Sequence, residues 1–223
     1  MSYNKIKTDP HLGQKVHEYL VSVGVETPVT DNGLSKAEKM EKIEDNFNQI
    51  LDTLGLDRRD DSLIDTPKRI AKMYVNEIFW GLDYEAFPKA TVVENKMKYN
   101  EMVIVKNISV QSYCEHHFVV IDGLACVAYV PKEKVLGLSK INRIVEYFAK
   151  RPQIQERLTE QVYHALSFIL ETKDVAVMID GDHYCVKSRG VEDTGSSTIT
   201  SRLGGGFKSD HKARAEFIAL ARS

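Results

Sequence analysis

The sequence contains few cysteines, little net charge and no long apolar segment. It has 3 cysteines in 223 residues and a formal net charge of −2. Three widely spaced cysteines cannot form a complete set of disulfides, so we expect a reducing compartment, the cytoplasm. The balanced charge argues against non-specific binding to nucleic acid. No apolar run reaches the roughly 20 residues of a membrane span, and the N-terminus MSYNKIKTDPHLGQKVHEYL lacks the apolar region of a secretory signal. We therefore expect neither nucleic acid nor a membrane as a partner.

The hydrophobic pattern predicts an α+β protein with a helical first part. Apolar residues recur at helical spacing in three segments before residue 98: 12–24, 35–54 and 66–81. Ser35 and Glu38 form a capping box at the second segment; Thr66 can cap the third, and Pro67 suits its first helical position. After residue 99 the pattern predicts two strands, EMVIVKNISV and FVVIDGLACVAYV, followed by two helices, SKINRIVEYFAKR and IQERLTEQVYHALSFIL. The pattern then returns to strands in VAVMID, HYCVKSRG and STITSRL, and KARAEFIALAR is a last helix.

The stretch SYCEHHFVVIDG concentrates side chains that bind metals or protons: Cys114, Glu115, His116 and His117. On a regular strand, Cys114 and His117 point to opposite faces, so they can bind one ion only if the chain turns or bulges here. The spacing alone is a weak signal, because a buried cysteine beside a surface histidine has the same pattern.

A second stretch, HYCVKSRG, strengthens the metal interpretation. If it is a strand, His183, Cys185, Lys187 and Arg189 share one face, a composition that suits the floor of a pocket better than a core. Cys114, His117 and Cys185 supply two thiolates and one imidazole, a ligand set typical of zinc, and leave the fourth position open as in catalytic sites. His116 and His183, next to these ligands, are candidates for proton transfer. We interpret Lys187 as solvated surface and Cys126 as a core residue.

Pairs of cations indicate an anion site. Arg69 with Lys72, and Lys140 with Arg143, are three residues apart on predicted helices. Together with Arg189 they could hold a polyphosphate, although each pair alone is typical of a solvated surface. The segment RLGGGFK lacks the ending of a phosphate-binding loop and is interpreted as an ordinary loop.

Four blocks in order resemble GTP cyclohydrolase I of the bacterial type: CEHHF at 114–118, GLSKINRIV at 137–145, RPQIQERLT at 151–159 and HYCVKSRG at 183–190. The resemblance runs through about residues 36–220. It implies that residues 1–98 are an N-terminal helical region and that residues 99–223 are a tunnelling-fold catalytic domain, an antiparallel sheet with helices on one side. It also implies a homo-oligomer, a decamer of two pentamers, with sites at subunit boundaries.

The implied activity is zinc-dependent hydrolysis and ring rearrangement of GTP, by cleavage of a cyclic amidine C–N bond. The products are 7,8-dihydroneopterin triphosphate and formate, in the first step of tetrahydrofolate and pterin biosynthesis. Hydrolytic attack at C8 of guanine opens the imidazole ring, a second hydrolysis frees formate, and proton transfers close the pterin ring.

By resemblance, the site residues form three groups. Zinc is held by Cys114, His117 and Cys185, the same three residues that the residue types indicate. The catalytic group comprises His116 and His183, which handle protons, and Gln155, near the reacting carbon. Glu156 is the carboxylate, expected to be buried, that holds the guanine edge. The ribose and triphosphate contact Ser139, Lys140, Arg143 and Arg189, joined by Arg69 and Lys72.

Two rival functions differ in testable features. A zinc nucleotide deaminase needs H-x-E followed by P-C-x-x-C, and neither HHF at 116–118 nor HYC at 183–185 supplies that frame. A structural zinc module would have a fourth protein ligand and no turnover.

Overall fold

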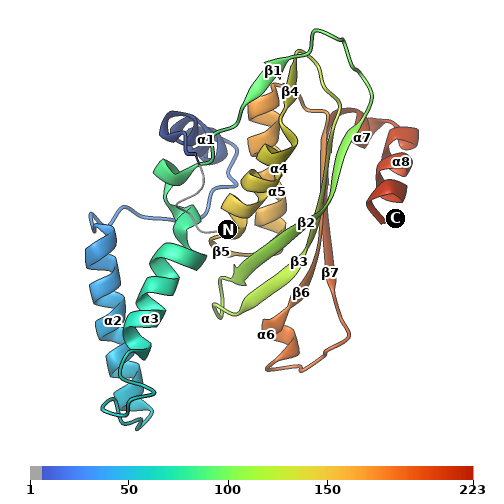
Figure 1. Ribbon diagram of the computed structural model, residues 1–223. Coiled ribbons are helices and arrows are strands. Elements are labelled where there is room, and N and C mark those ends of the chain that lie inside the picture. Colours follow the sequence, from blue (N-terminus) through green and yellow to red (C-terminus); the bar gives the residue numbers. More distant parts are fainter. Residues whose placement is uncertain (1–6, 223) are drawn as a thin grey trace.

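A five-stranded sheet forms the centre of the computed structural model, which describes residues 7–222 (Figure 1). The expectation about a secretory signal falls partly on residues 1–6, which lie outside this range. The elements in chain order are α1 (Pro10–Ser22), α2 (Lys36–Thr53), α3 (Thr66–Met73), β1 (Val92–Glu94), β2 (Val103–Cys114), β3 (Val120–Tyr129), β4 (Lys134–Leu136), α4 (Leu138–Ala149), β5 (Pro152–Gln153), α5 (Gln155–Leu170), β6 (Val175–His183), α6 (Tyr184–Lys187), β7 (Thr198–Leu203), α7 (Gly205–Ser209) and α8 (His211–Arg222). Across the described residues, no helix is long and apolar enough to cross a membrane.

The order of strands in the sheet is β5-β2-β3-β6-β7. Neighbours are antiparallel except for the short β5, which runs parallel to the end of β2. The register pairs Tyr113 with Val120 and Ile121 with His183, so three chain segments meet at one end of the sheet. The residues predicted as metal ligands lie at or next to this end of the sheet.

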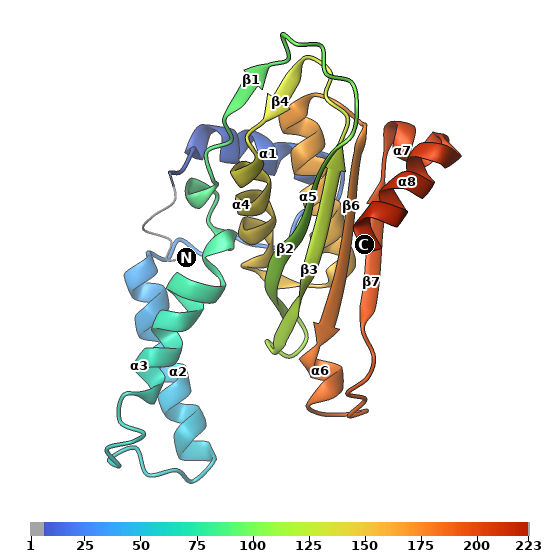
Figure 2. The same ribbon diagram turned by 45° about the vertical axis from the view of Figure 1, so that its right-hand side comes forward.

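Helices cover both faces of the sheet (Figure 2). α4 and α5 pack on one face, and their buried side chains form the main core with alternate residues of the strands, such as Val127 and Val177. The expected α+β tunnelling fold is confirmed. In addition, α7 and α8 lie against the opposite face, where Cys126 joins Phe207 and Phe217 in a second buried cluster. The core assignment of Cys126, which is 5% exposed, is confirmed.

The helices α2 and α3 form an arm that extends away from the sheet (Figures 1 and 2). The capping box of Ser35 and Glu38 is present. The apolar stripe of α2 is only partly covered: Leu51 is its one buried residue within the described chain, Phe47 is half-buried against Tyr74, and Ile50 and Leu54 are 44% and 68% exposed. An apolar pattern marks a face that needs a partner, but it does not say whether this chain supplies that partner.

Two local predictions are wrong. Thr66 is not the cap of α3: it is the first helical residue, and the cap position belongs to Asp65, whose side chain makes no capping hydrogen bond. The chain then continues as a π-helical turn over Tyr74–Ile78. The glycine-rich loop is partly helical, because Gly205–Ser209 forms α7, whose Gly206 amide donates to the Asp174 carboxylate at 2.7 Å.

Candidate active site

A tight turn between β2 and β3 carries the first two metal-binding candidates. We call residues 114–118 the ligand turn. The Phe118 amide donates to the Cys114 carbonyl at 2.8 Å, and Phe118 has a positive φ of 53°, which reverses the chain. The turn that a shared ion requires is therefore present, and it brings the side chains of Cys114 and His117 together: Cys114 Sγ lies 3.8 Å from His117 Nδ1.

Cys185 lies on a short helix, not on a strand. β6 ends at His183, and α6 covers Tyr184–Lys187, so the prediction that His183, Cys185, Lys187 and Arg189 share a strand face is wrong. Alternating side chains mimic a strand over so few residues, and a single helical turn gives no periodic signal. α6 nevertheless brings Cys185 to the ligand turn.

An ion pair fixes α6 to the sheet. Lys187 Nζ lies 2.9 Å from an oxygen of Asp182 in β6, and the lysine side chain is only 17% exposed. The interpretation of Lys187 as solvated surface is therefore wrong. The Ser188 hydroxyl also donates to the Tyr184 carbonyl at 2.6 Å. These contacts hold the turn that presents Cys185.

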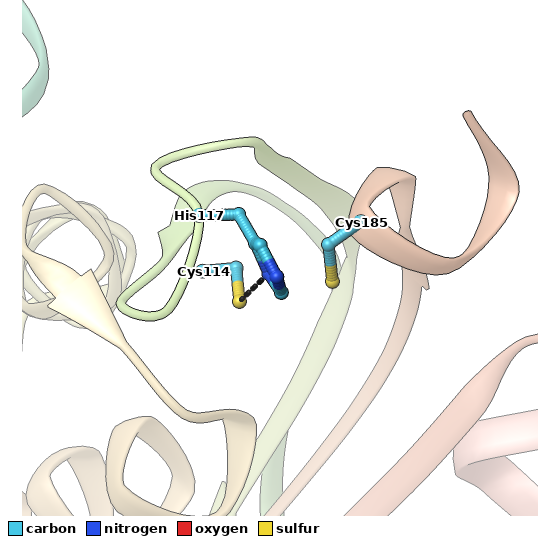
Figure 3. A group of neighbouring side chains, drawn as sticks. All are labelled: Cys114, His117 and Cys185. Carbon is cyan, nitrogen blue, oxygen red and sulfur yellow. Dashed lines mark hydrogen bonds between the residues drawn. The ribbon is translucent and has the colours of Figure 1, made fainter. Parts of the chain in front are cut away.

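The three proposed ligands converge, as Figure 3 shows. The ligand atoms of Cys114, His117 and Cys185 all lie within 4.8 Å of one another. Around zinc, bonds of about 2.3 Å to sulfur and about 2.0–2.1 Å to nitrogen separate tetrahedral ligand atoms by about 3.5–3.8 Å. The donor chemistry and spacing therefore fit zinc after a small contraction. Burial raises the pKa of the Cys185 thiol, as does its hydrogen bond with Cys114, whereas Arg189 lowers it.

A buried amide orients His183 beside this cluster. Gln155 is 2% exposed, and its amide nitrogen donates to the carbonyls of Ile179 and Thr198 at 3.0 and 2.8 Å and to the Thr200 hydroxyl at 3.1 Å. The amide oxygen is thereby left to accept from His183 Nε2 at 2.8 Å. His183 therefore carries its proton on Nε2 when neutral and keeps the lone pair of Nδ1 free.

Burial lowers the pKa of His183, and the carboxylates of Glu156 and Asp182 partly oppose this effect. The imidazole is thus kept neutral at pH 7, the form that accepts a proton. The influence of Glu156 also indicates that this carboxylate lies near the cluster. Glu156 is in the first turn of α5 and is exposed, where the sequence analysis expected a buried carboxylate.

Two further predicted site residues lie at the ligand turn: His116 is part of it, and Arg189 contacts it. His116 is exposed, with Nδ1 3.7 Å from Cys114 Sγ. Arg189 Nη1 donates to His117 Nε2 at 2.6 Å. In a neutral His117, the proton is then on Nδ1, on the side of Cys114.

Other predicted anion-binding residues lie elsewhere in the chain. Ser139 and Lys140 are in the first turn of α4, beside β4, whereas α4 runs toward β5 and the ligand turn (Figure 1). At 1.5 Å per residue, the helix separates its two ends by about 16 Å. Arg143 lies one turn further along α4. On the arm, Lys72 is exposed and Arg69 is paired with Asp65 at 3.3 Å.

Residues that support the site from outside were not predicted from the sequence. Arg157 forms an ion pair with Glu115, and Asp182 binds α6 through Lys187. In the sequence, the only indication of the first pair was Glu115 itself, a carboxylate next to the proposed metal ligands with no role assigned to it.

Comparisons with known proteins identify the family of this chain. The family model described as GTP cyclohydrolase I matches residues 43–222. The GTP cyclohydrolase 1 of Shewanella amazonensis is 62% identical over 209 residues, which cover 94% of this chain and 97% of that protein. The GTP cyclohydrolase 1 of Aeromonas hydrophila is 60% identical over 204 residues, which cover 92% and 94%. The match spans the ligand turn, α5 and α6 together. The chain therefore belongs to the GTP cyclohydrolase I family of enzymes.

Proposed function

We propose that this enzyme uses zinc to convert GTP and water to formate and 7,8-dihydroneopterin triphosphate, the first step of tetrahydrofolate and pterin biosynthesis. The observation that carries the proposal is the convergence of Cys114, His117 and Cys185 beside a neutral, oriented His183. This arrangement combines a three-ligand metal site with a proton acceptor, as a hydrolysis requires.

Cys114, His117 and Cys185 would hold the zinc ion. When bound, zinc supplies Lewis acidity that brings the pKa of a water molecule to about 7. If His117 binds through Nδ1, its ring proton must move to Nε2, which can then no longer accept from Arg189. Loading of the metal would thus free the Arg189 guanidinium, which could then bind a phosphate group in a bidentate manner.

His183 and His116 handle protons in this proposal. His183 Nδ1 keeps a free lone pair, because Gln155 binds the proton on Nε2. Gln155 is buried against β6 and β7, so we assign it the role of orienting His183 rather than of touching the substrate. His116 is exposed on the ligand turn, where a substrate can reach it.

Glu156 would recognise guanine. A carboxylate accepts two hydrogen bonds from the N1–H and the amino group of guanine, whereas adenine offers no such pair of donors. Since Glu156 is exposed in the single chain, the pocket around guanine would be completed by another subunit.

Assembly would also bring the triphosphate-binding residues together. Ser139 and Lys140 lie at the end of α4 far from the ligand turn and Arg143 lies near the middle of this helix, so we do not expect a single chain to bring all three to one phosphate group with Arg189. A homo-oligomer, the decamer of two pentamers that the family resemblance implies, would combine them at subunit boundaries. Arg69 and Lys72 would contribute from the arm, within the N-terminal helical region 1–98 that precedes the catalytic domain 99–223.

A cytoplasmic location accompanies this proposal, because thiolate ligands need a reducing compartment. The test is to incubate the zinc-loaded protein with GTP and to measure formate together with the fluorescent oxidised pterin. We expect both products in equal amounts, loss of both after chelation, and recovery on addition of Zn²⁺. Deamination of GTP, or no reaction by the fully loaded protein, would contradict the proposal.

A further inference from the structure

Glu115 has no role yet, although it lies between a metal ligand and a proton-transfer histidine. Its carboxylate is outside the converging ligand atoms of Cys114, His117 and Cys185. One oxygen lies 2.5 Å from Arg157 Nη1, and the other is 3.9 Å from His116 Nε2. The carboxylate therefore faces α5 more closely than it faces the imidazole.

Glu115 binds the segment before and within α5 at two points. Its amide donates to the Gln153 carbonyl at 3.0 Å, and its carboxylate pairs with Arg157, four residues further along the chain. The side chains are 25% and 17% exposed, so water screens this pair less than it screens an open surface pair. The Arg157 guanidinium thereby links the ligand turn to α5.

The first turn of α5 also carries two residues of the proposed site. Gln155, two residues before Arg157, orients His183, and Glu156 is the proposed guanine ligand. The ion pair thus connects the turn that carries two metal ligands to the helix that carries the proposed guanine carboxylate. No other charged pair among the described residues joins these two elements.

We propose that Glu115 and Arg157 are positioning residues that hold the ligand turn at a fixed place against the first turn of α5. The inference rests on the proposed function, since it assigns the pair to the zinc and guanine sites. Residues that orient metal ligands from outside typically change metal affinity or activity by about 10–100-fold when they are replaced.

The experiment is a double-mutant cycle with Glu115→Gln, Arg157→Met and the double variant. The full-length protein is titrated with Zn²⁺ in competition with a chromophoric chelator, and kcat and KM for GTP are measured at saturating Zn²⁺. Glu160→Gln is the matched control, because Glu160 forms an ion pair with Arg202 at 3.0 Å on the same helix at similar exposure. Thermal unfolding of each variant separates a loss of positioning from a loss of folding.

We expect each single variant to weaken Zn²⁺ binding and to lower kcat by about 10-fold, with KM less affected. The double variant should lose no more than about twofold in Zn²⁺ affinity and kcat beyond either single variant, because both changes remove the same interaction. Glu160→Gln should leave both quantities unchanged. If Glu115→Gln does not fold, Glu115→Asp replaces it and should show a smaller loss in the same direction.

Independent, additive losses in the cycle would overturn the proposal, as would unchanged Zn²⁺ affinity and kcat in both single variants. These outcomes are distinct from failure of the proposed function. A wild-type protein that binds no Zn²⁺ or does not convert GTP refutes the function, whereas an active wild type with unaffected variants refutes only the positioning role.

Discussion

Replacement of Gln155 by methionine tests whether His183 depends on this amide. The Gln155 side chain makes four hydrogen bonds, three from its nitrogen to Ile179, Thr198 and Thr200 and one from His183 to its oxygen. Methionine has a similar volume but no polar atom to replace these bonds. At a net contribution of roughly 0.5–1.5 kcal/mol for each bond, the free energy of unfolding should fall by about 2–6 kcal/mol.

Turnover should fall as well, since His183 would lose the contact that fixes its proton on Nε2. We expect kcat/KM for GTP to drop by about 100-fold or more, the lower limit for loss of a general acid or base. Gln161→Met is the matched control: Gln161 is 0% exposed on the same helix and binds Val25, Thr27 and Gln153. It should be destabilised to a similar extent and remain active. Equal kcat/KM in the two variants, measured beside denaturant unfolding, would refute the role of Gln155.

Three further predictions follow from the same structure. Glu156→Gln should lower kcat/KM for GTP by about 10-fold or more, because a pair of guanine donors loses its ionised acceptor; steady-state kinetics with an unchanged value would exclude the guanine contact. Cys126→Ser should keep zinc but lower the unfolding free energy by about 1–3 kcal/mol, since a hydroxyl enters an apolar cluster; atomic emission that shows zinc loss would contradict this. Burial lowers the pKa of His164, so its contribution to stability is complete above the unfolded pKa of 6.5 and is lost as the pH falls from there through the lower pKa of the folded state. Denaturant unfolding from pH 8 to 5 should therefore show a weaker loss of stability at acid pH in His164→Gln, and identical profiles would contradict this prediction.

A cluster of residues that could hold a metal could be predicted from the sequence, because zinc accepts few side-chain types. Two cysteines and a histidine at Cys114, His117 and Cys185 limited the interpretation before any geometry was known. The α+β order was predictable for the same kind of reason, because long helices and alternating strands have distinct periods. The short helix α6 was not, since Tyr184–Lys187 spans a single turn.

Contacts between distant segments were also beyond the sequence. Arg157 lies 42 positions from Glu115, and neither residue type indicates a partner at that separation. The α2 stripe shows a different limit, because its apolar spacing was recognised correctly while Ile50 and Leu54 remain exposed in this chain. Periodicity reports which face is apolar, and only the folded arrangement reports what covers it.

Adjacent histidines on the ligand turn provide the most direct test of the account. Zinc content by atomic emission and GTP turnover should be measured for His116→Ala and His117→Ala in parallel. We expect His117→Ala to lose both zinc and activity, because two remaining ligands hold the ion too weakly. We expect His116→Ala to retain about one zinc ion per chain, in keeping with the three-ligand site, and to be slower by about 10²–10⁴-fold. Zinc loss in His116→Ala together with retention in His117→Ala would contradict the assignment and exchange the two roles.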